Sequence, residues 1–221
     1  NSFDAYHKHS IIEQGAVIIS DIFSNHLFYF LTQGHHDFLG INYYFHHRFI
    51  RKSGLIPQFV DISTGERDVS DLGWELYPEG IFEVLTDLQD DLPIYITECG
   101  IASTNDDRRT RFLISYLQVV YRAIKAGVKI NGFFYWSLID NFEWHRGYNP
   151  RFGLIEVDYS TQERRIRNSS YVYRDIIRFN AIPHHFLKLL GHSVDVEDVL
   201  GAKDVQCKEC KILLGKKKKS E

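Results

Sequence analysis

The chain has 221 residues, with 26 Lys and Arg against 29 Asp and Glu, and its formal net charge is −3. Because 44% of the residues are hydrophobic and 14% are aromatic, the chain has enough apolar material for the core of one domain, and a wholly disordered chain is excluded. The near-neutral charge argues against a nucleic-acid-binding protein, and apolar runs such as residues 130–138 are too short to cross a bilayer.

The start of the sequence differs from that of an ordinary complete chain. There is no Met, and the first residue is Asn1, so we expect either that an N-terminal stretch was removed or that the chain is part of a longer one. No basic and then apolar leader opens the sequence, and three Cys residues do not make a disulfide framework. Free Cys residues are typical of a reducing compartment, which favours a cytoplasmic location.

Three apolar runs predict buried strands, because their apolar residues do not alternate with polar ones. These runs are residues 38–44, 92–97 and 128–136. Apolar residues at helical spacing predict helices over residues 78–88, 108–126, 171–179 and 183–190. Pro78 suits a first helical position, and Gly127 is placed to end the second helix. The alternation of strands and helices predicts an α/β protein with a parallel sheet.

The last residues form a segment of different composition. Residues 202–221 hold seven Lys and three acidic residues, so residues 201–221 are interpreted as a solvated Lys-rich tail and residues 1–200 as the folded part. A contact with RNA or an anionic surface is the alternative for this tail. Cys207 and Cys210 form a C-x-x-C pair that supplies only two of the four ligands that zinc needs. An ordinary pair of thiols is the preferred interpretation. The alternatives are a redox pair and a metal site completed by His184, His185 and His192.

Polar and aromatic side chains follow each predicted strand. Glu98 comes directly after the second strand, and Asn42 and Tyr44 end the first. The third strand leads into residues 136–144, which include two Trp, two acidic residues and an Asn. Active sites of (β/α) barrels lie at this carboxyl edge of the sheet. Flat rings beside carboxylates and amides suit a sugar, and a carboxylate there can attack an anomeric carbon.

Five segments resemble motifs of family 1 glycoside hydrolases, the β-glucosidase and β-galactosidase family, and they occur in the family's order. They are residues 37–44 (DFLGINYY), 73–80 (GWELYPEG), 95–100 (YITECG), 132–144 and 151–159 (RFGLIEVDY). The resemblance covers roughly residues 20–180. It implies a (β/α)8 TIM barrel, of which this chain forms only the C-terminal part, with strands matching the sixth to the eighth.

The resemblance also implies an activity and a role for two residues. The activity is that of a retaining β-glycosidase acting on β-glucosides or β-galactosides through a covalent glycosyl-enzyme intermediate. Glu98 corresponds to the nucleophile, and Tyr44 to the tyrosine whose hydroxyl bonds that carboxylate. No cofactor or metal is implied.

Five further positions correspond to sugar-binding residues of the family. Asn42 matches an asparagine on the acid/base side of the pocket, and Trp136 matches the platform under the sugar. Glu143 and Trp144 match the pair that bonds the far hydroxyls of that sugar, and Phe152 matches an aromatic wall residue. The sequence around Glu143 suits unmodified sugars better than phosphorylated ones.

Two departures from the family's pattern limit this interpretation. The family usually has Asn after the nucleophile, and Cys99 stands there instead, which we interpret as a buried small side chain. The chain also lacks the Asn-Glu-Pro motif that carries the acid/base glutamate. We therefore expect activity to need a missing N-terminal half of the barrel. The alternatives are an inactive fragment and a non-catalytic sugar-binding or interaction protein on the same fold.

Overall fold

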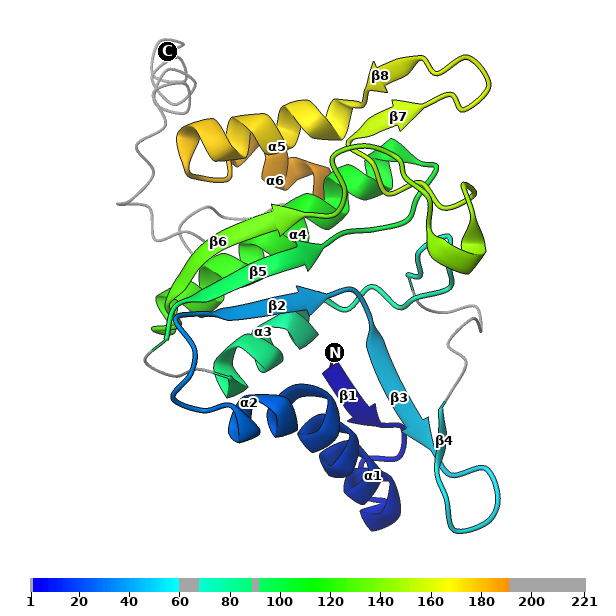
Figure 1. Ribbon diagram of the computed structural model, residues 1–221, viewed down its shortest axis with the longest axis vertical. Coiled ribbons are helices and arrows are strands. Elements are labelled where there is room, and N and C mark those ends of the chain that lie inside the picture. The colour runs from blue at the N-terminus through cyan, green and yellow to red at the C-terminus, as the bar shows by residue number, and fades with distance from the viewer. Residues whose placement is uncertain (1, 60–67, 89–91, 191–221) are drawn as a thin grey trace, which may run out of the picture.

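A computed structural model describes residues 2–59, 68–88 and 92–190 of the chain (Figure 1). At its centre is a parallel sheet of three strands, in the order β2 (Leu39–Tyr43), β5 (Ile94–Cys99) and β6 (Ile130–Tyr135). The main helices around it are α3 (Pro78–Asp87), α4 (Asp106–Lys125) and α5 (Asn168–Phe179). The predicted parallel α/β arrangement is thus confirmed, with element ends that differ from the expected ones by a few residues.

Local sequence signals account for the long helix α4. Asn105 precedes it, and its side chain accepts hydrogen bonds from the backbone N–H groups of Asp107 and Arg108 at 2.9 and 3.3 Å. Such a cap satisfies backbone donors that have no partner within the helix. After the helix, Gly127 has a φ of 102°, a left-handed conformation that glycine adopts without steric cost. The helix therefore begins and ends where its sequence dictates.

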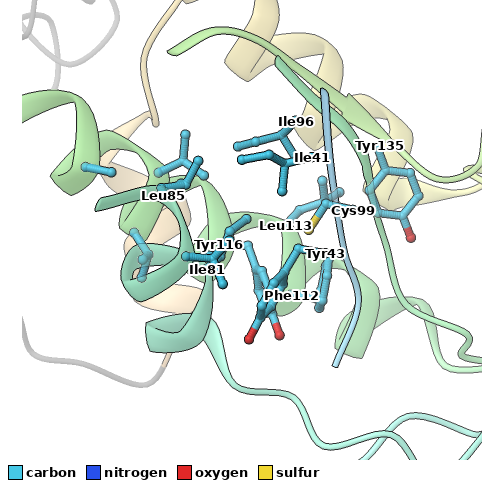
Figure 2. Close-up of a cluster of buried hydrophobic side chains, with 14 of the residues drawn as sticks. Ile41, Tyr43, Ile81, Leu85, Ile96, Cys99, Phe112, Leu113, Tyr116 and Tyr135 are labelled. Carbon is cyan, nitrogen blue, oxygen red and sulfur yellow. The ribbon is translucent and has the colours of Figure 1, made fainter. Parts of the chain in front are cut away.

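The hydrophobic core lies between the sheet and helices α3 and α4 (Figure 2). Ile41 and Tyr43 of β2 and Ile96 of β5 meet Ile81 of α3 and Phe112 of α4, and all five side chains are buried. The rings of Phe112 and Tyr116 are stacked with centroids 3.9 Å apart. Burial of so many large side chains fixes the sheet against its helices, because each contributes about 1.5–3 kcal/mol.

A second sheet, which the sequence analysis did not predict, lies beside α3. It contains β1 (Ser2–Ala5), β3 (His46–Ile50) and β4 (Gln58–Phe59) in the order β1-β3-β4. The sheet was not predicted because β3 begins with polar residues, which are typical of a surface loop. His46 is nevertheless only 2% exposed: its Nδ1 lies 2.8 Å from Ser2 Oγ, and its ring contacts Tyr77. Burial lowers the pKa of His46 to about 4. Distant partners therefore bury a side chain that looks like a surface residue in the sequence.

Helical segments precede and follow these sheets. The N-terminal part contains α1 (Ile11–Asp21), a π-helical turn η1 (Ile22–His26) and α2 (Leu27–Leu31). The C-terminal part contains the 3-10 turn η2 (Trp144–Arg146), the hairpin strands β7 (Ile155–Val157) and β8 (Arg164–Ile166), α6 (His184–Leu187) and the 3-10 turn η3 (Lys188–Leu190). The Lys-rich tail, Cys207 and Cys210 lie outside the described residues. Within residues 2–59, 68–88 and 92–190, no helix is long and apolar enough to span a bilayer.

Candidate active site

The carboxyl ends of β2, β5 and β6 meet at one edge of the parallel sheet. In the register of β2 and β5, Asn42 lies opposite Glu98. The end of β5 also approaches the chain after β6 closely: a Cβ on Gly100 would lie 1.8 Å from the carbonyl oxygen of Trp136. Only glycine allows this approach. Residues that are far apart in the sequence are therefore neighbours at this edge.

Tyr44 holds the carboxylate of Glu98 in place. The Tyr44 hydroxyl donates a hydrogen bond to Glu98 Oε2 at 2.6 Å, a short distance typical of bonds to a charged acceptor. Burial raises the pKa of the Tyr44 phenol well above its ordinary value, and the negative charge of Glu98 raises it further. The phenol therefore stays protonated and remains a donor at neutral pH.

Two aromatic rings fix the position of Tyr44 in turn. Its ring makes edge contacts with Trp74 and Phe152, with centroids 5.9 and 6.1 Å away. Phe152 is only 1% exposed and its ring packs against Tyr44 and Trp74, and a direct contact of Phe152 with a ligand stays a prediction. Trp74 contacts both Tyr44 and Phe152, which makes it a packing residue of the site that the sequence analysis did not single out.

A second carboxylate, that of Glu143, is held by two donors on one oxygen. Glu143 Oε1 accepts from the indole Nε1 of Trp136 at 3.2 Å and from Asn141 Nδ2 at 2.7 Å. Asn141 is itself oriented by the hydroxyl of Ser137, 3.1 Å from its Oδ1. Glu143 Oε2 accepts no hydrogen bond from the described residues, so it is available to a ligand hydroxyl. Trp136 and Glu143, both expected in the site, are therefore brought together.

The side chains of Asn42 and Trp144 are held by fewer contacts than that of Glu143. Asn42 is exposed, and its Oδ1 accepts from the hydroxyl of Thr97 at 2.7 Å, which places its amide beside the end of β5. Trp144 follows Glu143 directly but is 80% exposed. The structure thus presents Trp144 to solvent, and its contact with a sugar stays a prediction.

A buried ion pair joins the segments that carry these side chains. The Asp140 side chain is fully buried, and each of its oxygens lies 3.0 Å from a different nitrogen of Arg167. It also accepts from the backbone N–H groups of Gly153 and Val157 at 2.8 and 3.3 Å. Burial acts to raise the pKa of Asp140, but the hydrogen bonds and charge of Arg167 outweigh it and lower the pKa. Asp140 thus ties the loop bearing Trp136 to the segment bearing Phe152.

Cys99 takes no part in this arrangement. It is fully buried within the hydrophobic core, as expected for a small apolar side chain, and burial raises the pKa of its thiol. A thiol in such a position is protonated and unreactive. Among the described residues at the strand ends there is also no cluster of side chains suited to a metal ion.

Some residues of the site were missed because their roles depend on contacts. Asn141 and Asp140 lie in the segment after the third predicted strand. Their spacing does not indicate that Asn141 orients Glu143 or that Asp140 holds the loop through Arg167. One feature of the sequence could have indicated the role of Asn141. It stands two residues before Glu143, so its amide can reach the Glu143 carboxylate.

Comparison with known proteins places this chain in a family. Residues 7–182 match the profile of glycosyl hydrolase family 1. A β-galactosidase of Sulfolobus acidocaldarius is 37% identical over 192 residues, which cover 82% of this chain and 37% of that protein. β-Glucosidase A of Thermotoga maritima is 37% identical over 165 residues, covering 66% of this chain and 35% of that protein.

Solved structures agree with the sequence matches. The β-glycosidase from Pyrococcus horikoshii superimposes with a TM-score of 0.77 at 34% identity, over 86% of this chain and 49% of the other. The β-glucosidase from Thermotoga maritima in complex with glucoimidazole gives a TM-score of 0.72 at 28% identity, over 82% of this chain and 50% of the other. The chain spans half or less of the length of these relatives. By its sequence and its fold, the chain belongs to glycosyl hydrolase family 1.

Proposed function

We propose that the chain carries the nucleophile side of a retaining β-glycosidase site. The observation that supports this most directly is the 2.6 Å hydrogen bond from Tyr44 to Glu98 at the carboxyl end of β5. Glu98 lies near the carboxyl end of β5, and β5 pairs with β6, the strand that leads to Trp136 and Glu143, which supports this role. The matching relatives are β-galactosidases and β-glucosidases, which supports β-glucosides or β-galactosides as the substrate class.

The proposed reaction proceeds in two displacements. In the first, a Glu98 oxygen forms a bond to the anomeric carbon while the bond from that carbon to the leaving oxygen breaks. In the second, water attacks the same carbon while the bond to Glu98 breaks, and the proton of the water passes to the second carboxylate, which has already protonated the leaving oxygen; the configuration is therefore retained. The Tyr44 hydroxyl keeps one oxygen of the carboxylate occupied, which leaves the other to attack. Asn42, Trp136, Glu143, Trp144 and Phe152 surround the sugar in this proposal.

The leaving oxygen must be protonated by a second carboxylic acid, about 5–5.5 Å from the nucleophile. The sequence lacks the family's Asn-Glu-Pro motif, so we propose that this acid comes from a part of the barrel outside these 221 residues. The strands β2, β5 and β6 would then be the sixth, seventh and eighth of a complete (β/α)8 barrel. Three strands cannot close a barrel, which supports this assignment. A cytoplasmic location is part of the proposal and rests on the free thiol of Cys99.

An inhibitor with an activated leaving group tests the role of Glu98 even though the carboxylic acid that protonates the leaving oxygen is, in this proposal, missing from this chain. 2,4-Dinitrophenyl 2-deoxy-2-fluoro-β-D-glucoside has a leaving group that needs no protonation, and its fluorine slows release of the intermediate. We expect the 221-residue chain to gain the mass of one fluoroglucosyl group, located on Glu98 by peptide mass spectrometry. Hydrolysis of an unactivated alkyl β-glucoside is expected to be absent. A chain that binds the sugar but is never labelled would support a non-catalytic sugar-binding protein instead.

Replacement of Tyr44 by Phe tests the hydrogen bond to the nucleophile. The substitution keeps the ring contacts with Trp74 and Phe152 but removes the donor, so the Glu98 carboxylate loses a charge-assisted bond of about 1.5–3 kcal/mol. We expect the rate of labelling by the inhibitor to fall by about 10- to 100-fold, with the melting temperature nearly unchanged. An unchanged labelling rate would show that Tyr44 does not position the nucleophile.

A further inference from the structure

We propose that Asp21, His26 and Asp87 form a binding site for a divalent transition-metal cation such as Zn²⁺, apart from the strand ends. His26 Nε2 lies 3.1 Å from Asp21 Oδ2 and 2.7 Å from Asp87 Oδ2. All three ligand atoms lie within 4.8 Å of one another. One imidazole nitrogen and two carboxylate oxygens are donors that zinc binds at bond lengths of about 2.0–2.2 Å, which puts ligand atoms about 3.3 Å apart. Small side-chain rotations are therefore enough to admit the ion.

The π-helical turn η1 is what brings two of these ligands together. In an α-helix with about 3.6 residues per turn, side chains five positions apart point about 140° away from each other. A π-helical turn closes hydrogen bonds between residues five apart, as the bond from Leu27 N–H to Ile22 O does here. Asp21 and His26 are also five apart, and this wider turn places them on one face. Such turns occur frequently at functional sites.

The outer contacts of Asp21 orient it toward the proposed ion. Asn25 Nδ2 donates to Asp21 Oδ1 at 2.6 Å, so Oδ2 is the oxygen that faces His26. Hydrogen bonds of this kind to a ligating carboxylate are a regular part of metal sites. Asp87 is the last residue of α3, so the site joins the N-terminal helical segment to a helix that covers the central sheet (Figure 1).

The surface beside these ligands is lined by acidic side chains. A cavity of about 560 Å³ lies here, and Asp21, Glu83 and Asp87 are among its lining residues, whereas the described residues that line it include no Lys, Arg or His. Burial raises the pKa of Glu83, and the nearby carboxylates of Asp4 and Glu79 raise it further. A hollow lined by charges of one sign concentrates the opposite ion. The exposed fractions of His26, Asp21 and Asp87 are 30%, 34% and 59%, so water can complete the coordination.

The same distances also fit an ion pair of His26 with two carboxylates that holds no metal. A metal site and an ion pair of this kind differ in whether they bind zinc. Calorimetric titration of the 221-residue chain with ZnCl₂ separates them. Cys207 and Cys210 are first replaced by Ser, since a C-x-x-C pair also binds zinc. We expect one equivalent of zinc in this background, and a loss of at least tenfold in affinity in both His26→Gln and Asp87→Asn. The two variants lie on different elements, so a folding defect in one does not remove the test.

A matched control uses another His–carboxylate pair near the N-terminus, that of His7 and Glu13. His7 Nδ1 lies 2.9 Å from Glu13 Oε1, and among the described residues this is the one carboxylate that pairs with it, so His7→Gln should leave the zinc stoichiometry and affinity unchanged. At a free zinc concentration of about 100 times Kd, we also expect the melting temperature to rise by roughly 5–10 °C, in His7→Gln as in its parent but not in His26→Gln. If the parent binds no more zinc than His26→Gln does, the cluster is an ion pair only and the proposal is wrong.

Discussion

Glu98→Gln is expected to abolish covalent labelling by the activated fluoroglucoside and to lower the hydrolysis of 2,4-dinitrophenyl β-glucoside by about 10⁴-fold or more, the size of effect typical of losing a nucleophile. The amide nearly matches the carboxylate in shape and still accepts the bond from Tyr44. What it lacks is the negative charge that attacks the anomeric carbon. The measurement is the initial rate of dinitrophenolate release, together with the intact mass of the chain.

Azide distinguishes loss of a nucleophile from loss of the fold. In Glu98→Ala, azide fits the space left by the side chain and attacks the anomeric carbon from the same face. 2,4-Dinitrophenyl β-glucoside, whose leaving group needs no protonation, then yields the α-glycosyl azide, because only one displacement takes place. The control is Glu156→Gln, which alters an exposed carboxylate on β7 and should leave labelling unchanged. Normal labelling of Glu98→Gln would mean that another residue is the nucleophile.

Asp140→Asn is expected to lower the free energy of unfolding by about 3–5 kcal/mol, since it leaves the buried guanidinium of Arg167 without its charged partner. The Arg167 side chain is 9% exposed and that of Asp140 is fully buried, so water cannot replace the lost contact. Urea denaturation at pH 7 measures this change. Labelling of Glu98 should weaken as well, because Asp140 ties the Trp136 loop to the segment that supports Tyr44.

The difference in unfolding free energy between the parent chain and Asp140→Asn should depend on pH in one direction. The pKa of Asp140 is lowered in the folded chain, so the folded state favours the carboxylate, and the stabilisation is fully present above the unfolded pKa of about 3.9. It is lost as pH falls through the lower folded value. The gap in stability between the parent and Asp140→Asn should therefore narrow below about pH 4.

An exposed ion pair serves as the control for this substitution. Glu163 lies 2.5 Å from Arg165, but the two side chains are 55% and 64% exposed. Surface pairs of this kind contribute little to stability, so Glu163→Gln should leave the denaturation midpoint nearly unchanged. An effect of Asp140→Asn no larger than that of Glu163→Gln would contradict the structural role given to Asp140.

The local sequence was sufficient to predict the central elements. The strands β2, β5 and β6 are short apolar runs, and α3 and α4 carry apolar residues at helical spacing between a start signal and a stop signal. These patterns depend on backbone geometry and on neighbours within a few positions. The grouping of Glu98 with residues of other strand ends followed as well, because parallel strands place their carboxyl ends at one edge.

Contacts between distant residues decided the rest. Nothing near His46 in the sequence says that Ser2 and Tyr77 bury it, so the strands β1 and β3 were not predicted. The π-helical turn that unites Asp21 with His26 has no sequence signal of its own. Likewise, the sequence does not distinguish Asp140 from any other acidic residue after a strand. Its role depends on its contacts with Arg167 and the backbone of Gly153. Burial, pairing and charge compensation are properties of the assembled chain, and they determine which polar side chains hold the site together.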